Sequence, residues 1–190
     1  LILTALMLIP LAQASHVVGG DIAIQWQSQN NYRLKLRYYR DDINGGPSMP
    51  LNVTVTVYDA VTHAQVTNQT LPRTSIGIVP LGDPCYTPDP NVVRIEEGIF
   101  DSSTDLFLPD NPNGYYMSYH VGARNNLAIN VQQYGNMTWF AMLADPALGQ
   151  NSTPDFGNYP NDAYFCITGP KQFTYPITEA DGDSIAYKLT

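Results

Sequence analysis

The acidic stretch near the C-terminal end is the best candidate for a metal site in this sequence. Asp181 and Asp183 flank Gly182, and Glu179 lies two residues before Asp181. Two carboxylates on either side of a glycine can both turn toward one hard cation, and calcium accepts oxygen ligands in flexible geometry. Further ligands would have to come from elsewhere, and an acidic turn between strands explains the same residues. Calcium bound by Asp181, Asp183 and Glu179 is therefore a hypothesis.

The aromatic residues suggest a different kind of site. Trp26, Trp139 and thirteen tyrosines can supply flat apolar surfaces on which sugar rings stack. Trp139 lies between Thr138 and Phe140, which is equally typical of a core position. Exposed aromatic side chains in a groove would favour a carbohydrate-binding module, whereas buried ones would favour a structural role.

The remaining reactive residues do not form the pattern of a known catalytic centre. His16, His63 and His120 are far apart, and none has a second histidine at metal-ligand spacing. Glu96 and Glu97 are adjacent, so on a strand they face opposite sides and make a poor acid–base pair. The sequence contains no nucleophile elbow, phosphate-cradling loop or histidine–glutamate zinc motif. We predict that the protein is not an enzyme; a hydrolase whose site assembles only in space is the alternative.

The N-terminal residues predict export. Residues 1–11 are apolar except for Thr4, and Ala12-Gln13-Ala14 follows them as a cleavage signal. The run is too short to span a bilayer, so we read residues 1–14 as the remnant of a signal peptide and predict no transmembrane segment. The expected location is extracellular, at the cell surface. In that compartment Cys85 and Cys166 can form a disulfide worth roughly 4 kcal/mol, but the sequence does not show that they meet.

The composition indicates a folded chain of many short strands. Of its 190 residues 44% are hydrophobic and only 14% are charged, and it contains 15 prolines and 14 glycines. The net charge of −8 argues against nucleic acid as a partner, because little in the chain would neutralise phosphates.

The strand pattern is clearest over residues 31–42. Tyr32, Leu34, Leu36 and Tyr38 alternate with Arg33, Lys35, Arg37 and Tyr39, which predicts one buried and one solvated face. Residues 51–57 repeat the alternation after a polar loop, so the two segments should pair antiparallel. Further strands are predicted over residues 17–26, 61–70, 76–79, 92–100, 115–124, 127–131, 137–144, 163–168 and 172–177.

This spacing predicts an all-β fold, an antiparallel Greek-key β-sandwich of immunoglobulin-like type. Two small sandwiches packed together, or a closed barrel, are the alternatives. Residues 15–169 would form this module, and residues 170–190 would begin a following PKD- or cadherin-like β domain.

The chain contains an ordered series of short motifs. They are His16-Val17-Val18-Gly19-Gly20-Asp21-Ile22, Tyr32-Arg33-Leu34-Lys35-Leu36, Tyr39-Arg40-Asp41, Glu97-Gly98-Ile99-Phe100, Gly114-Tyr115-Tyr116-Met117-Ser118-Tyr119, Arg124-Asn125-Asn126, Asn151-Ser152-Thr153-Pro154-Asp155-Phe156 and Asp181-Gly182-Asp183-Ser184-Ile185-Ala186-Tyr187. This series, which covers nearly all of the mature chain, resembles the N-terminal region of large secreted surface proteins of Bacteroidota. Those proteins often carry PKD- or Ig-like repeats and a gliding-motility-associated C-terminal sorting domain.

The resemblance implies export by the type IX route and a role in adhesion or surface architecture. It carries over no catalytic residue. Family members often have cysteines where this chain has Asp42 and Gly122-Ala123, so the resemblance does not support any particular disulfide.

These observations predict a non-enzymatic structural or adhesion module of a multidomain bacterial surface protein. Its expected partners are cell-surface glycans or other surface proteins, and further β domains of the same chain. A carbohydrate-binding module and a self-assembling filament subunit, which would pair through an exposed edge strand, are the alternatives.

Overall fold

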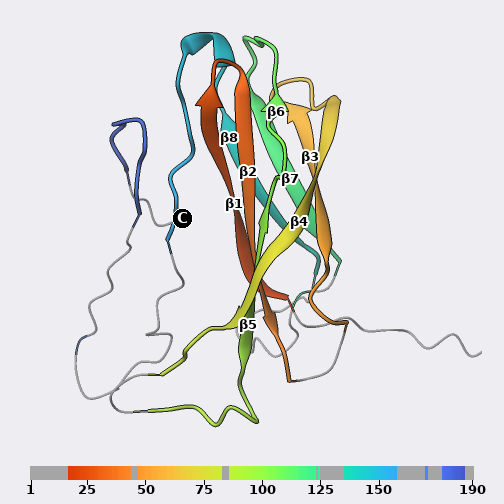
Figure 1. Ribbon diagram of the computed structural model, residues 1–190, viewed down its shortest axis with the longest axis vertical. Coiled ribbons are helices and arrows are strands. Elements are labelled where there is room, and N and C mark those ends of the chain that lie inside the picture. Colours follow the sequence, from red (N-terminus) through yellow and green to blue (C-terminus); the bar gives the residue numbers. More distant parts are fainter. Residues whose placement is uncertain are drawn as a thin grey trace, which may run out of the picture.

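The computed structural model describes residues 17–43, 47–82, 86–122, 124, 135–157, 170 and 177–186. The predicted signal peptide and the strands expected at 127–131, 163–168 and 172–177 lie outside these residues, apart from Ile177. The described part is all-β and antiparallel, as the sequence predicts, with one short 3-10 helix (Figure 1). Its elements are β1 (Val17–Ser28), β2 (Asn31–Asp41), β3 (Asn52–Asp59), β4 (Gln65–Ile78), β5 (Ile95–Asp101), β6 (Leu106–Phe107), β7 (Tyr115–Val121), β8 (Met137–Leu143) and η1 (Pro146–Leu148).

The strands form two packed layers. Their hydrogen-bonded order is β1-β2-β5-β4-β3-β7-β8, and β6 continues the pairing of β5 along β2. Sheet A contains β1, β2, β5, β6 and the second half of β4, whereas sheet B contains the first half of β4 with β3, β7 and β8. This is the strand arrangement of a constant-type immunoglobulin domain, with Greek-key crossings between the layers. The described strands thus form one sandwich rather than two.

The long strand β4 joins the two sheets. The sequence predicts two segments here, at 61–70 and 76–79, but residues 60–64 turn the chain and 65–78 form one strand. Its first half pairs with β3 through Pro72, and its second half pairs with β5 from Arg73 onward. A register shift between Arg73 and Ser75 marks a bulge, which bends the strand from one layer into the other.

The core lies between the sheets and follows the predicted alternation. On β2 the even-numbered residues from Tyr32 to Tyr38 point inward, and β3 and β7 contribute the residues that face them. The largest fully buried side chains are those of Tyr32, Tyr115, Phe100, Ile24, Leu34, Leu36, Leu71, Leu108, Met117, Val55 and Val57.

Tyr115 forms the tyrosine corner of an immunoglobulin-like fold. It is the first residue of β7, and its hydroxyl donates a 2.8 Å hydrogen bond to the carbonyl of Pro109. In antibody domains a cysteine follows two residues after this tyrosine. Met117 occupies that position here and is fully buried, so apolar packing stands where antibody domains have an inter-sheet disulfide.

A close approach of β1 to β8 nearly closes the sandwich on the side away from β4. The α-carbon of Gly20 lies so near the indole of Trp139 that an added Cβ would be 2.5 Å from it and 2.4 Å from the carbonyl oxygen of Arg37. Only glycine fits there. The register of β1 on β2 also shifts between Val17 and Gly19, which marks a bulge just before this contact.

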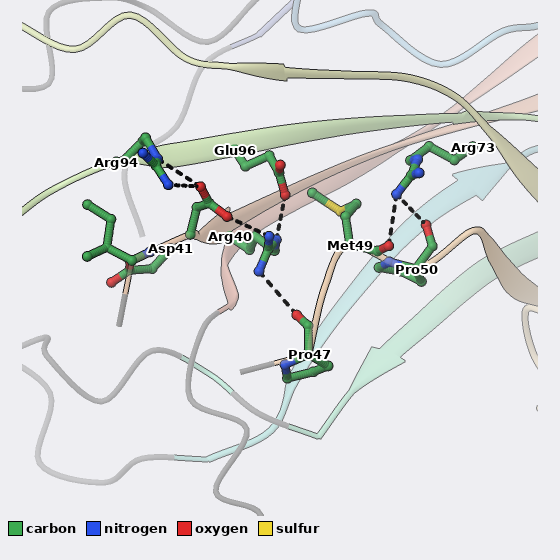
Figure 2. A network of polar contacts seen from close by, with 10 residues as sticks. Arg40, Asp41, Pro47, Met49, Pro50, Arg73, Arg94 and Glu96 are labelled. Atoms are coloured by element: carbon green, nitrogen blue, oxygen red, sulfur yellow. Dashed lines mark hydrogen bonds and ion pairs between the residues drawn. The ribbon is translucent and has the colours of Figure 1, made fainter. Parts of the chain in front are cut away.

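A network of ion pairs connects the C-terminal end of β2 to the start of β5. Arg40, at the end of β2, pairs with Glu96 at 2.6 Å and with Asp42 at 2.7 Å, and it donates to the carbonyl of Pro47 (Figure 2). Arg94 binds the second oxygen of Asp42 at 2.6 Å. Because Arg40 and both of its carboxylate partners are largely buried, each charge depends on the others for compensation.

Gly20→Ala should lower the free energy of unfolding by about 2–3 kcal/mol, because the new methyl group overpacks the contact between β1 and β8. Urea unfolding of the full chain measures the change. Gly19→Ala is the matched control, since nothing lies within 4 Å of a Cβ at that position. Equal losses in both variants would contradict the close approach.

Arg40→Ala should lower the free energy of unfolding by about 3 kcal/mol, because it leaves the buried carboxylates of Glu96 and Asp42 with lost or reduced compensation. Arg33→Ala breaks the exposed pair with Asp105 and should cost less than about 1 kcal/mol. The same urea titration compares them, and a small loss for Arg40→Ala would show that the network contributes little.

Candidate functional site

The two sheets differ sharply in charge. The sheet B segments 52–59, 65–72, 115–121 and 137–143 contain no lysine, arginine or glutamate, and their one aspartate, Asp59, ends β3. The sheet A strands carry Asp21, Arg33, Lys35, Arg37, Arg40, Asp41, Glu96, Glu97 and Asp101. We call the outward side of β3, β7 and β8 the neutral face. It consists of Thr54, Thr56, Tyr58, Tyr116, Ser118, His120, Thr138, Phe140 and Met142.

Apolar and aromatic side chains extend across the neutral face from β8, the last strand of the hydrogen-bonded order. Phe140 and Met142 are 67% and 62% exposed, although both are large and hydrophobic. The strand register places Met142 opposite Tyr116, and Tyr116 opposite Tyr58, so these three residues form a row across the sheet. The two tyrosine rings stack with centroids 4.9 Å apart and planes 14° from parallel. Such a surface can bind by contact but offers little acid–base chemistry.

Asp59 holds the turn that places His63 beside the row of aromatic residues and Met142. Hydrogen bonds from the backbone N–H of Thr62 and from the side chains of Asn113 and Asn111 hold the pKa of Asp59 below its usual range. These bonds fix the turn after β3. The turn places the ring of His63 edge-on to Tyr116, with centroids 5.8 Å apart.

Trp26, near the end of β1, lines a groove beside the β1–β2 turn. It is partly buried against the core, and its indole N–H donates a 2.8 Å hydrogen bond to the carbonyl of Gln29. The groove has a volume of about 410 Å³. The residues that we call the loop-end groove are Trp26, Gln29, Asn30, Phe107, Asp110 and Gln150. The structure thus places one of the two predicted stacking residues in a groove.

The other predicted stacking residue, Trp139, is a core residue. It is only 7% exposed, and its ring packs edge-on against Tyr38 at a centroid distance of 5.3 Å and lies beside Tyr119 at 5.6 Å. Burial raises the pKa of Tyr38 to about 12, so the cluster is uncharged at neutral pH. The inward position of Trp139 on β8 puts it against β1 and β2, and its proposed role in sugar stacking is wrong.

Three carboxylate oxygens of the acidic turn accept hydrogen bonds within the protein, whereas the second oxygen of Glu179 is buried without a hydrogen-bond partner among the described residues. One oxygen of Glu179 accepts hydrogen bonds from the backbone N–H groups of Asp181 and Asp183, at 2.9 and 2.7 Å. The carboxylate of Asp181 accepts from the side-chain amide of Gln150 at 2.7 Å and from the backbone N–H of Ser152. The described residues contain no cluster of three or more potential metal ligands. This geometry describes a turn docked on residues 150–152, and the calcium site remains a prediction.

The expectation of a solvated outer face on β2 is wrong at Arg37. This side chain is only 3% exposed as a residue, and it pairs with Asp21 at 3.2 Å and with Asp155. Asp155 belongs to the segment after η1, which runs back beside β1 in Figure 1. The neighbouring Thr153 extends this contact, since its hydroxyl accepts from the N–H of Ile24 at 2.8 Å. A segment distant in sequence therefore covers the edge of β1.

Two of the sequence predictions fall outside the described residues. Cys85 and Cys166 are not among them, so their pairing stays a prediction. The domain boundary near residue 169 also falls there. On its far side, Thr178 exchanges backbone hydrogen bonds with Asp155 at 2.9 and 3.0 Å, which brings residues 177–186 against the segment that covers β1.

One property of the neutral face, its lack of charged residues, can be read from the sequence. The absence of charge in residues 52–58, 115–121 and 137–143 is visible in the sequence, but only the strand register shows that these segments are neighbours. Phe107 has no comparable signal, because its place in the groove that Trp26 also lines depends on the pairing of β6 with β2.

Comparison of the chain with protein-family models, curated proteins and solved structures finds no match. The similarity to Bacteroidota surface proteins therefore remains a prediction. Among the residues that the structure describes, no helix is long and apolar enough to cross a membrane.

Asp155→Asn should destabilise the fold by about 2 kcal/mol at pH 7, through loss of a charged hydrogen bond with Arg37. Burial alone would raise the pKa of Asp155, but hydrogen bonds from Arg37 and the N–H of Gly157 lower it. Its contribution is therefore present above the unfolded pKa of about 4 and is lost as the pH falls through the lower folded pKa.

Asp21→Asn is the matched variant. Burial raises the pKa of Asp21 despite the neighbouring Arg37. The protonated form of Asp21 therefore stabilises the fold, and this stabilisation is lost as the pH rises through the folded pKa, the reverse of the dependence for Asp155. Unfolding free energies between pH 3 and 7 should thus show a smaller loss for Asp21→Asn at pH 7. Equal losses at pH 7 would refute the assignment of Asp155 as the stabilising partner.

Proposed function

We propose that this chain is a non-enzymatic adhesion module of an extracellular bacterial surface protein, and that it contacts a second copy of itself through the neutral face. The observation that carries the proposal is the exposed, charge-free surface around Phe140 and Met142. Protein interfaces are enriched in aromatic residues and methionine and are depleted of lysine, glutamate and aspartate at their centres. The neutral face has this composition.

The net charge supports a second copy as the partner. Two molecules that each carry a charge of −8 repel one another wherever their acidic surfaces meet. The neutral face contributes no lysine, arginine, aspartate or glutamate, so two copies can meet there without placing like charges opposite each other. A contact of the same face on both molecules is also the common, closed form of association.

The size of the face predicts a weak contact. Three strands about 4.8 Å apart, with a rise of about 3.4 Å per residue over seven residues, make a face roughly 14 by 24 Å. This is below the area of a permanent interface. Weak contacts suit adhesion when many modules act together, because linked copies gain affinity through their high effective concentration.

The sequence supports the remaining parts of the proposal. The cleavage pattern at Ala12-Gln13-Ala14 is typical of an exported protein. The ordered motifs resemble the N-terminal regions of Bacteroidota surface proteins, in which further β domains would follow this one. Calcium at Asp181 and Asp183 would stiffen the junction to the next domain, although Asp181 already accepts hydrogen bonds from Gln150 and Ser152.

Phe140→Lys should abolish self-association, because it puts a charge on the exposed apolar part of each neutral face. Sedimentation velocity of the full chain from about 10 µM to 1 mM should show a monomer–dimer equilibrium that this variant lacks. Phe107→Lys is the matched control, since Phe107 is similarly exposed at 63% but lies on β6, in sheet A.

A chain that stays monomeric at 1 mM would contradict the proposed partner. Larger species that grow steadily with concentration would favour the filament alternative instead. Dimerisation that Phe107→Lys disrupts and Phe140→Lys leaves intact would move the interface to the opposite sheet.

A further inference from the structure

The loop-end groove combines two aromatic side chains from different parts of the chain. Trp26 comes from the end of β1, and Phe107 comes from β6. Phe107 is 63% exposed, whereas its neighbours Leu106 and Leu108 are buried in the core. A large apolar side chain held outward between two core residues gives the groove a surface on which a flat ligand can stack, and the indole of Trp26 lines the same groove.

The indole is held in one orientation. Gln29 has a φ of 44°, in the left-handed region that a residue with a side chain rarely adopts. Its carbonyl accepts the 2.8 Å hydrogen bond from the indole nitrogen of Trp26. The donor of the indole is therefore already used, and what Trp26 presents to a ligand is apolar surface rather than the N–H group.

The polar residues of the groove are also held in place, and several of their side-chain oxygens are available to accept hydrogen bonds from a ligand. The side-chain amide nitrogen of Asn30 donates to one oxygen of Asp110 at 2.8 Å, and that of Gln150 donates to Asp181 at 2.7 Å. Among the described residues, the amide oxygens of Asn30 and Gln150 and the second oxygen of Asp110 have no hydrogen-bond partner. Each acceptor is thus oriented by the bond that the other end of its own side chain makes.

We propose that the loop-end groove binds a neutral saccharide. Sugar rings present an apolar face that stacks on aromatic side chains and a rim of hydroxyl donors that planar amides and carboxylates accept. The groove supplies both kinds of contact, and its volume of about 410 Å³ falls within the range of small-ligand sites.

Charge selects the class of saccharide. No lysine or arginine lines the groove, whereas Asp110 does, and the chain carries a net charge of −8. An acidic sugar would place its carboxylate or sulfate near Asp110 with no cation to compensate, so the groove favours uncharged sugars. This binding activity is separate from self-association, because the groove includes no residue of the neutral face.

The test is a saccharide array probed with the full chain, carrying neutral β- and α-linked glucose, xylose and mannose oligomers beside polygalacturonate and heparin fragments. Binding to at least one neutral oligomer, and none or much weaker binding to the acidic ones, is expected. Phe107→Ala should weaken binding about tenfold. Phe156→Ala, a change of the same residue type at an exposed position outside both the groove and the neutral face, should leave binding unchanged.

Nuclear magnetic resonance supplies a readout of the site itself. The chain has two tryptophans, so its spectrum contains two indole N–H signals, and Trp26→Phe assigns them. Titration with the bound oligomer should shift the signal of Trp26 and leave that of the buried Trp139 in place. Three outcomes would overturn the proposal: no neutral oligomer bound at millimolar concentration, preference for the acidic fragments, or binding that Phe107→Ala does not weaken.

Discussion

The bend in β4 is the constraint on which the two-layered structure depends. One strand pairs with β3 in sheet B as far as Pro72 and with β5 in sheet A from Arg73 onward. The bulge between Arg73 and Ser75 allows this change of partner, and the guanidinium of Arg73 donates to the carbonyls of Met49 and Pro50 beside it (Figure 2). Because the same strand belongs to both layers, their separation and relative angle are set at this corner.

The layers that β4 joins are covered differently. On sheet A the outward side chain of Arg37 is buried beneath Asp155, and residues 152 and 153 bond to the backbone of β1. Burial of that charge is tolerated because two carboxylates compensate it. On sheet B the outward side chains carry no charge, and Phe140 and Met142 stay exposed. Exposed apolar surfaces of this kind often mark interaction sites, and we propose that this one binds a partner.

The proposed recognition surfaces differ in the way they are built. The neutral face is a regular array whose members are set by strand register, as the row Met142, Tyr116 and Tyr58 shows. The loop-end groove instead gathers residues from the β1–β2 turn, β6 and the segment after η1. The first suits a broad, weak contact between copies, and the second suits a small ligand held by oriented groups.

The sequence by itself determined the all-β class, the sandwich and most strand positions. Alternation in β2, β3 and β7 has a period of two that any register must respect, so it can be read locally. Tertiary structure alone decided that Trp139 lies inward against Gly20, that Arg37 is covered by Asp155, and that Phe107 and Trp26 line one groove. Each of these facts depends on contacts between residues far apart in the chain, and local periodicity carries no information about which distant segment covers a given face.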